Sequence, residues 1–432
     1  MVPAGGSGEG ESERALPRRF GDYVLVEHLA QSPRADTWVA MQAEAPGAPG
    51  LCILKSLHRA ITADPAYVQR FLSAARAAVQ LHHPHIAAVV DVGKVEEVYY
   101  LATEHVPGRT LHEVLQRAAR DRVALPTTVA LTLLSELFDA LDYAHHRTHS
   151  ATQQPLHFVH RELGPDSVRV SFAGDLKLID IGLVRSALEL ERTLPGAEPG
   201  RLAYQSPEQV RGEELNARSD VFAAAVLAFE VLSGERYYPG KSADEVWQLA
   251  ATGGFIPPAL QRLPSGLRLI LERALRAERN RRTPSCAQLR RELLAHFHEV
   301  QARPNAVRAF MSGLFPGAEA VSRRHLEALC SMVAPRLPAG ATVRFVERVS
   351  VASAEAPTVV RDVSLLRQEL SAPDTMGALA STAPSRPMFS LPPTDAEPVT
   401  RDRLRRHSLA DADVVTEPEY RAPTVPGRKP KG

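Results

Sequence analysis

The stretch VHRELGPDSVRVSFAGDLKLIDIG, residues 159–182, contains a short island with the pattern of β-strand, VRVSFAGDLKLID at 168–180. The sequence on both sides of this island is helical in period. Apolar residues recur near every 3.6 positions from Leu131 to His145. After the island the same spacing predicts helices at about 220–233, 243–251, 265–277 and 285–299. This half of the chain is therefore expected to be mostly helical.

Further upstream the pattern changes to strand. Between Tyr23 and Thr103, short β-branched and aromatic runs alternate with turns: YVLVEHL, TWVAMQ, LCILKSL, IAAVVDVG and VEEVYYLAT. One helix interrupts them, from about Asp64 to Leu81, with one apolar face formed by Val68, Phe71, Leu72, Ala75 and Val79. The sequence thus predicts an α+β protein of two lobes. The first is a small antiparallel sheet with one helix, and the second is larger and helical.

Composition excludes several classes of function. The chain has 432 residues, 44% of them hydrophobic, and a formal net charge of +1, so no global field attracts nucleic acid or an acidic membrane. The three cysteines (52, 286 and 330) lie far apart and suggest neither a disulfide framework nor a zinc site. The longest apolar run, Val221–Phe229, is too short to span a bilayer. We expect a cytoplasmic protein that binds neither membrane nor nucleic acid.

Changes of composition divide the chain into four parts. Residues 1–19 are rich in Gly, Ser, Glu and Arg and are expected to be a disordered leader; 20–299 form the folded domain. Residues 300–334 form a helical extension, whose apolar faces (Val307, Phe310, Met311 and Leu314, then Leu326, Leu329 and Val333) predict docking on the domain. Residues 335–432 are expected to be a mostly disordered tail. Within it, Ser408 follows two arginines and is a hypothetical phosphorylation site.

A set of motifs in a fixed order identifies the family that the chain resembles. The motifs are ILK at 53–55, HHPHI at 82–86, TEHVPG at 103–108, VHRELGPDS at 159–167, KLIDIG at 177–182, SPE at 206–208, RSDVFAAAVLAFEVLSG at 218–234 and Arg282. Their order and spacing resemble the eukaryotic-type Ser/Thr protein kinases of bacteria, and the insert before the catalytic loop is similar to that of myxobacterial kinases. The resemblance covers about residues 20–299. It implies a two-lobed protein kinase-like fold.

Four residues match positions that hold the helical lobe of such kinases together. The resemblance implies that Glu208 pairs with Arg282, that Asp220 caps the backbone of the catalytic loop, and that Arg161 faces the activation segment. Breaking a buried ion pair costs about 3–5 kcal/mol, so these residues indicate a folded domain. They carry no information about turnover.

The phosphate-binding loop departs from the family pattern. Phosphoryl transfer needs positioned phosphates, metal ions and an oriented hydroxyl, and glycines let the backbone approach the phosphates closely. Ala30, Ser32 and Ala35 occupy the three glycine positions of LAQSPRADTWVA, and Pro33 removes one N–H donor. Either Arg34 grips phosphates in their place or the segment is an ordinary solvated hairpin. We favour the hairpin.

The lysine that binds phosphate in this family is present as Lys55, expected in the nucleotide cleft. Its acidic partner on the following helix is replaced by Ala74. Lys55 therefore either holds nucleotide loosely or extends to solvent. The resemblance also assigns nucleotide-binding positions to Thr103, Glu104 and Val106.

The catalytic loop has lost its characteristic Asp and Asn. Glu162 stands at the position of the catalytic Asp, one methylene longer, and a misplacement of about 1 Å can cost about a hundredfold in rate. Ser167 replaces the metal-binding Asn and is a weaker ligand. Arg201 replaces the Thr that contacts the catalytic Asp. Asp180 is retained and could bind one Mg²⁺, or could serve as a polar hinge of the activation segment.

Together these departures predict a pseudokinase that regulates or scaffolds Ser/Thr phosphorylation through a protein partner, either a kinase or a kinase substrate. Binding of ATP and Mg²⁺ is expected to be weak or absent. Two alternatives stay open. One is an active but atypical Ser/Thr kinase, with Glu162 as the base, Lys55 on phosphate, and Asp180 and Ser167 on metal. The other is a non-catalytic ATP sensor.

Overall fold

A computed structural model of the chain describes residues 16–42, 50–149, 152–179, 199–298 and 304–333. All of them belong to one compact unit, Met1–Ala372, while a second unit, Pro373–Gly432, lies outside the described residues. The predicted leader up to residue 15, the predicted tail with Ser408, and the candidate metal ligand Asp180 also lie outside them.

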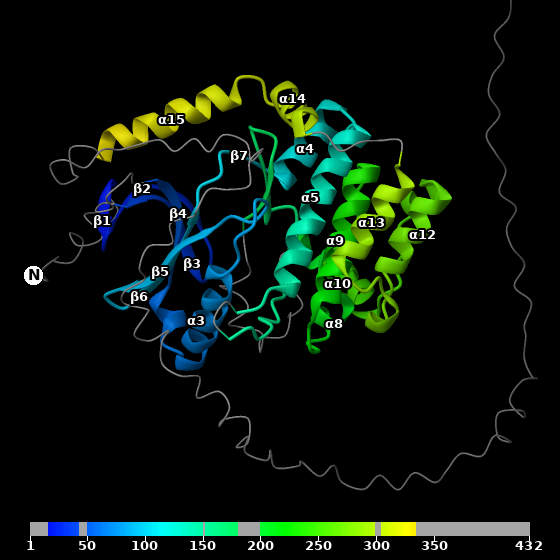
Figure 1. Ribbon diagram of the computed structural model, residues 1–432, viewed down its shortest axis with the longest axis horizontal. Coiled ribbons are helices and arrows are strands. Elements are labelled where there is room, and N and C mark those ends of the chain that lie inside the picture. Colours follow the sequence, from blue (N-terminus) through cyan, green and yellow to red (C-terminus); the bar gives the residue numbers. More distant parts are fainter. Residues whose placement is uncertain (1–15, 43–49, 150–151, 180–198, 299–303, 334–432) are drawn as a thin grey trace, which may run out of the picture. The chain divides into compact units, whose positions relative to one another are not determined.

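The first lobe is a six-stranded antiparallel sheet in the order β1-β2-β3-β4-β6-β5 (Figure 1). Its strands are β1 (Arg18–Phe20), β2 (Tyr23–Gln31), β3 (Ala35–Gln42), β4 (Leu51–Leu57), β5 (Val89–Val95) and β6 (Val98–Glu104). Five of the six follow the strand patterns of the sequence. The last hairpin differs from the prediction, because Glu96 adopts a left-handed φ of 52° and makes the turn between β5 and β6.

The helix of this lobe, α3 (Pro65–Val79), follows a short helix α2 (Arg59–Thr62). It begins at Asp64, whose carboxylate accepts a hydrogen bond from the Ala66 N–H at 2.9 Å. Its buried residues are Tyr67, Phe71, Ala75 and Ala78. The apolar face predicted from the sequence shares Phe71 and Ala75 with this buried face but includes Val68 in place of Tyr67. The difference brings the fully buried Tyr67 into the core that α3 shares with the second lobe.

The second lobe is helical, with one small sheet at its boundary with the first. The sheet contains β7 (Gly108–Thr110), β8 (Val168–Ser171) and β9 (Leu176–Leu178). The helices are α4 (Leu111–Asp121), α5 (Thr127–His146), α7 (Pro199–Leu202), α8 (Pro207–Val210), α9 (Ala217–Ser233), α10 (Ala243–Thr252), α11 (Pro258–Arg262), α12 (Ser265–Ala274), the 3₁₀ turn η1 (Arg279–Arg281) and α13 (Cys286–His296). Helix α9 is almost entirely buried, from Ser219 to Val231, and lies in the core of the lobe.

Two further helices, α14 (Pro304–Leu314) and α15 (Ala318–Val333), follow the second lobe. Figure 1 shows α14 beside α4 and α15 running from there toward β2. The predicted fold class is confirmed, since a small antiparallel lobe with one long helix precedes a larger helical lobe. No helix in the described ranges is long and apolar enough to cross a bilayer.

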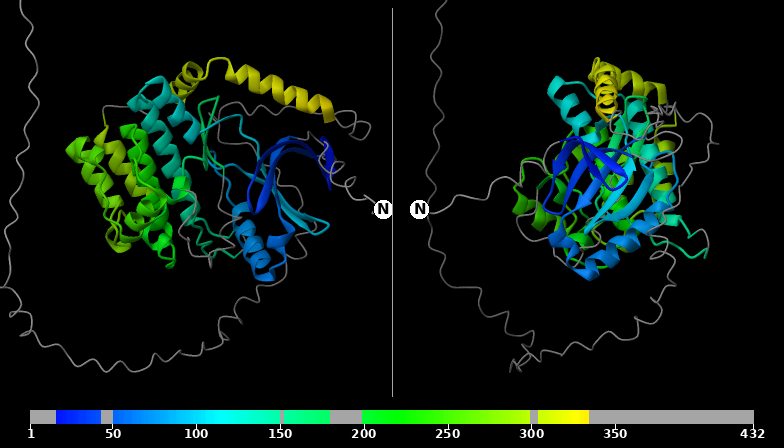
Figure 2. Two further views of the ribbon diagram at one scale, coloured as in Figure 1. Left: turned by 180° about the vertical axis from the view of Figure 1, so that it is seen from behind. Right: turned by 90° about the vertical axis from the view of Figure 1, so that its left-hand side faces the viewer.

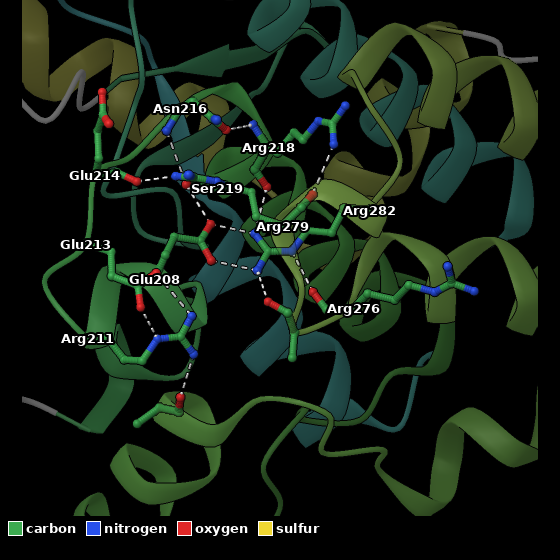
Figure 3. A network of polar contacts seen from close by, with 12 residues as sticks. Glu208, Arg211, Glu213, Glu214, Asn216, Arg218, Ser219, Arg276, Arg279 and Arg282 are labelled. Atoms are coloured by element: carbon green, nitrogen blue, oxygen red, sulfur yellow. Dashed lines mark hydrogen bonds and ion pairs between the residues drawn. The ribbon is translucent and has the colours of Figure 1, made fainter.

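A buried ion pair joins distant parts of the second lobe (Figure 3). The Arg282 guanidinium donates to the two carboxylate oxygens of Glu208 at 2.5 and 2.6 Å. Its remaining hydrogen-bonding capacity goes to backbone carbonyls of residues 218, 276 and 277. All five N–H groups of Arg282 thus have acceptors, and Ser219 adds a further hydrogen bond to Glu208 at 2.7 Å. Because both charges are compensated, α8, the start of α9 and the segment before α13 are held together.

Replacing Arg282 with alanine is expected to lower the free energy of unfolding by about 3–5 kcal/mol, because it leaves a buried carboxylate without its partner. The matched control is Arg281→Ala, which removes a neighbouring arginine whose side chain is 70% exposed and pairs only with an exposed Glu278. The control should change stability by no more than about 1 kcal/mol. Urea unfolding followed by circular dichroism measures both, and equal losses would contradict a special role for Arg282.

The same pair predicts a dependence of stability on pH. Burial alone raises the pKa of the Glu208 carboxyl, but the hydrogen bonds and charge of Arg282 outweigh it, so the pKa lies below its ordinary value of 4.5. The contribution to stability is therefore complete above pH 4.5 and is lost as the pH falls through the lowered pKa. The stability difference between wild type and Glu208→Gln should shrink from pH 7 to pH 3. A constant difference would show that the pair does not titrate in this way.

Candidate functional site

Lys55 lies in the middle of the first sheet. It is on β4, directly opposite Thr37 of β3 and Leu101 of β6, and is half-buried. Paired residues of neighbouring strands point to the same face, so Thr37 and Lys55 share one side of the sheet. The two strands on either side fix the direction of the lysine side chain at this position.

The helix that should supply the acidic partner of Lys55 has no acidic side chain. The fifteen residues of α3, PAYVQRFLSAARAAV, are all described and contain neither Asp nor Glu. Ala74, which matches the acidic position, is partly buried among apolar side chains of the core. An ion pair between α3 and Lys55 is therefore excluded whatever the position of the helix.

The β2–β3 hairpin, which matches the phosphate-binding loop, is closed by its own hydrogen bonds. The Ser32 hydroxyl accepts from the N–H groups of Arg34 at 3.3 Å and Ala35 at 3.1 Å, and it donates to the Ala35 carbonyl at 2.9 Å. The Ser32 N–H donates to the same carbonyl at 2.9 Å. Pro33 has no N–H. The backbone donors of residues 32–35 are thus either occupied or absent, and they are the groups that would otherwise face phosphate oxygens.

The hairpin is also tied to the end of β4. The His58 N–H donates to the Arg34 carbonyl at 2.8 Å, and His58 Nδ1 lies 3.3 Å from the Pro33 carbonyl. The other ring nitrogen of His58 is 3.2 Å from a carboxylate oxygen of Asp36. These contacts hold both sides of the tip. They fit the ordinary hairpin expected from the sequence better than an open phosphate-binding loop.

Asp220 sets the backbone of the catalytic loop. Its carboxylate accepts from the N–H groups of His160 at 2.7 Å and Arg161 at 2.9 Å, and it is 2.7 Å from His145 Nε2. Arg161 has a left-handed φ of 68°, and Gln209 donates a hydrogen bond to its carbonyl. Burial raises the pKa of Asp220, but the contact with His145 and the backbone donors outweigh burial and lower it overall. The strained residue is thus held on both sides.

Ser167, the weak candidate for a metal ligand, is committed to the loop itself. Its hydroxyl donates to the Gly164 carbonyl at 2.9 Å and accepts from the Gly164 N–H at 3.0 Å. Its backbone carbonyl accepts from the Ile179 N–H at 2.9 Å, and the residue is buried. A role as a Mg²⁺ ligand would compete with these bonds.

Glu162 belongs to the catalytic loop. It lines a small pocket of about 50 Å³ with Arg161 and Ser167 of the loop and with Arg201 from α7. Ligand sites of drug-sized molecules have volumes of about 300–1,000 Å³, so this pocket is too small for one. Burial raises the pKa of Tyr67 on α3 to about 12; the guanidinium groups of Arg34 and Arg70 act against burial, and the Glu162 carboxylate adds to it. The pKa of Tyr67 therefore responds to charges on the hairpin tip, α3 and the catalytic loop.

Tyr67 and Arg70 were missed by the sequence prediction. Tyr67 falls one position away from the apolar face that the pattern defined, and Arg70 has the appearance of an ordinary surface residue of a helix. A signal was present in the spacing of Tyr67, Phe71 and Ala75, which also recurs every four residues. Nothing in the sequence indicated that Arg34 would act on the same tyrosine.

The segment that joins the two lobes is held by side chains from both. The Glu104 carboxylate accepts from Lys177 Nζ at 3.1 Å and from the Ala88 N–H at 3.2 Å. The Arg169 guanidinium donates to the carbonyls of Val106 at 2.7 Å and Gly108 at 2.9 Å. Thr103 precedes them on β6, where its hydroxyl lies 3.4 Å from the Ile53 carbonyl. The three predicted nucleotide-binding positions are thus brought together beside β4.

Gly108 is required by the close approach of β8 to this segment. A Cβ atom there would lie 2.2 Å from the Val170 carbonyl oxygen. The glycine therefore lets the backbone pass close enough for β7 to pair with β8.

The described residues meet only part of what ATP and Mg²⁺ require. Lys55 and the joining segment stand at positions that the family resemblance assigns to nucleotide binding. The backbone donors of the hairpin and the hydroxyl of Ser167 are already used, and α3 offers no carboxylate. Asp180 lies outside the described residues. These groups do not fit a tightly held ATP–Mg²⁺ complex, and no phosphoryl-transfer step follows from them.

Comparison with known proteins agrees with this geometry. Residues 54–296, more than half of the chain, match the protein kinase domain. The chain belongs to this family. Members of the family act with nucleotide on protein substrates. The match begins at Leu54 on β4, after the β2–β3 hairpin, and ends in α13.

Several relatives of this kinase domain come from bacteria. The tyrosine-protein kinase MasK of Myxococcus xanthus is 30% identical over 323 residues, which is 74% of this chain and 50% of MasK. The probable serine/threonine-protein kinase PknB of Lactococcus lactis is 32% identical over 193 residues, 45% of this chain and 29% of that protein. The chain thus spans half or less of the length of these curated relatives. The crystal structure of the PknI kinase domain of Mycobacterium tuberculosis matches with a TM-score of 0.51 and 25% identity, over 66% of this chain and 99% of that one.

Removing the Ser32 hydroxyl should open the hairpin. In Ser32→Ala, the amide protons of Arg34 and Ala35 lose their acceptor, and a hydrogen bond is worth about 1 kcal/mol, so both should exchange roughly fivefold faster. Ser73→Ala, at an exposed position of α3, is the control and should leave this exchange unchanged. Hydrogen exchange read by mass spectrometry on peptides covering residues 31–37 tests this. Unchanged exchange in Ser32→Ala would show that the hairpin does not depend on its serine.

Proposed function

We propose that this kinase domain is a pseudokinase, a regulatory or scaffolding module in Ser/Thr phosphorylation signalling. The observation that carries the proposal is the β2–β3 hairpin, whose backbone donors are satisfied by Ser32 and its neighbours. Phosphoryl transfer depends on positioning and charge stabilisation of the phosphates. The N–H groups of this loop are already hydrogen-bonded, so the loop has to break these bonds before it can position the phosphates or stabilise their charge.

The rest of the site supports the same proposal. Lys55 has no carboxylate on α3 to orient it, and Ser167 uses its hydroxyl within the catalytic loop. Glu162 stands where the family has Asp, beside Arg201 rather than beside a threonine. Catalytic groups that act as a unit contribute little separately. Once selection for turnover is lost, several of them are therefore expected to change together, as they have here.

The module is expected to act through a protein partner, either a kinase or a kinase substrate. The residues that shape the helical lobe are intact: Glu208 and Arg282 are paired, and Asp220 holds the catalytic loop. A surface that recognises kinases or their substrates can persist on such a framework without chemistry. Weak occupancy by ATP and Mg²⁺ at Lys55 is compatible with this role.

A second candidate, an active atypical kinase, is favoured by one observation. MasK, the relative that matches 74% of this chain, is named a tyrosine-protein kinase. In this case Lys55 would hold phosphate, Glu162 would take the part of the base, and Asp180 with Ser167 would bind metal. The third candidate, an ATP sensor without turnover, needs Lys55 and the joining segment but not Glu162.

Transfer of radiolabelled phosphate from ATP separates the proposal from the active kinase. Full-length protein with Mg²⁺ and a general acceptor such as casein should give no more label than its Asp180→Asn variant, because the phosphate loop and catalytic loop cannot position the reactants. A variant with Ala30, Ser32 and Ala35 changed to Gly, Ala74→Glu, Glu162→Asp and Ser167→Asn should gain measurable transfer. Activity in the wild type that Asp180→Asn abolishes would overturn the proposal.

Nucleotide binding separates the pseudokinase from the sensor. Thermal unfolding with and without millimolar ATP and Mg²⁺ should show a small shift or none, and any shift should disappear in Lys55→Ala. A large shift that survives Glu162→Ala and is lost in Lys55→Ala would instead establish the ATP sensor.

A further inference from the structure

Helix α15 packs its apolar stripe on the sheet of the first lobe. Leu326, Leu329, Cys330 and Val333 recur at helical spacing and are buried. They form one apolar cluster with residues of β2, β3 and β4: Val24, Val26, Val39, Met41, Leu51 and Ile53. Figure 2 shows α15 in two further views, reaching from α14 to this lobe. The contact between α15 and the sheet is therefore a continuous apolar cluster, and we call its part on β2, β3 and β4 the apolar seat of α15.

Strand register shows that this seat is on the face of the sheet that carries Lys55. Ile53 and Lys55 are two residues apart on β4 and so point to the same side. Val39 is paired with Ile53 as Thr37 is paired with Lys55. The residues paired across the strands form rows, and the row of Val39 and Ile53, which α15 covers, lies two residues along the strands, about 7 Å, from the row of Thr37 and Lys55. Thr103, at the start of the segment joining the lobes, is paired with Ile53 and so belongs to the covered row.

A polar contact ties α15 to β2 of the same sheet. His325 Nε2 lies 2.8 Å from a carboxylate oxygen of Glu27 on β2. Glu27 is paired with Val39, in the same row of the sheet. Burial, together with the charges of Arg169 and His325, lowers the pKa of His105, in the joining segment, to about 4. The helix is held on the row of the sheet that runs from Glu27 through Val39 and Ile53 to Thr103.

The other end of the extension is anchored to the second lobe. Val307 and Met311 of α14 are fully buried in the main core. The Phe315 ring lies under the guanidinium groups of Arg109 at 5.7 Å and Arg117 at 5.9 Å. Gly317 follows with a left-handed φ of 75° and turns the chain into α15. The helix is thus rooted in one lobe and seated on the other.

We propose that α15 is an intramolecular cap that restricts access of nucleotide to Lys55 from the side of the joining segment. Its stripe covers the sheet face next to Lys55, and its two ends hold the lobes at one separation. In the closed state a nucleotide that reaches Lys55 has to share this face with Leu329 and Val333 or displace them. The proposal goes beyond the function proposed above and holds whether or not phosphate is transferred.

Unseating the helix in the full-length chain tests the cap. Leu329→Asp combined with Val333→Asp places two carboxylates in the apolar seat, which they cannot occupy without large desolvation. The matched control is Val321→Asp with Met332→Asp on the same helix, where the side chains are 58% and 48% exposed. The probe is N-methylanthraniloyl-ATP with Mg²⁺, followed by fluorescence. Hydrogen exchange across residues 318–333 reports whether the helix has left its seat.

The unseated variant should bind the probe at least tenfold more tightly than wild type, and the control should equal wild type. This follows because the apparent Kd of a capped site rises in inverse proportion to its open fraction. Equal affinity, or no binding in either protein up to millimolar probe, overturns the cap. Retained exchange protection of α15 with both aspartates in place overturns it as well, because the apolar seat would then not be what holds the helix.

A milder variant covers the case in which the double substitution unfolds the first lobe. Glu27→Gln breaks the contact with His325 and leaves the apolar core intact. It should tighten binding of the same probe, but within about fivefold, because a partly exposed pair contributes at most about 1 kcal/mol. Weaker or unchanged binding in Glu27→Gln counts against the cap.

Discussion

The buried pair of Arg282 and Glu208 is the interaction on which the helical lobe depends. Arg282 donates five hydrogen bonds, two to Glu208 and three to backbone carbonyls from two segments of the chain, residue 218 and residues 276–277. The ring of Phe222 on α9 lies 5.1 Å from the guanidinium and covers it. Because α9 is fixed here, Asp220 on the same helix can reach the catalytic loop and hold the left-handed Arg161 in place. The shape of the catalytic loop is thus set from the core and not from the reacting groups.

This separation explains how the chain keeps the kinase fold while its site has changed. The residues that maintain the architecture act on backbone and on each other, and none of them needs nucleotide. The residues that would act on nucleotide have made other contacts: Ser32 closes its own hairpin, and Ser167 closes its own loop. Each substitution satisfies local hydrogen bonds that a ligand would otherwise satisfy, which favours the folded chain without a ligand. The position of Lys55 on a central strand is fixed by the sheet itself.

The sequence was sufficient to predict most of the strands, the long helices and the order of the architectural residues. Strand β4 and helices α5, α9 and α13 follow alternation and helical period closely, because each is long and has a strongly apolar face. The buried side of α3 was misplaced by one residue, since Val68 and Tyr67 are both apolar enough and only packing between lobes chooses Tyr67. The self-closure of the hairpin could not be predicted either. It depends on the Ser32 rotamer and on His58 from another strand, which local sequence does not specify.

The clamp of Arg169 on the joining segment has a mechanical consequence. Its guanidinium bridges the carbonyls of Val106 and Gly108, on either side of Pro107, and ties them to β8. Rotation of one lobe against the other at this point would pull these carbonyls from a largely desolvated cation, at a cost on the order of 3 kcal/mol. Gly108 adds to the stiffness, because the backbone of β8 lies against it with no space for a side chain. The connection between the lobes is thus a stiff joint rather than a pivot.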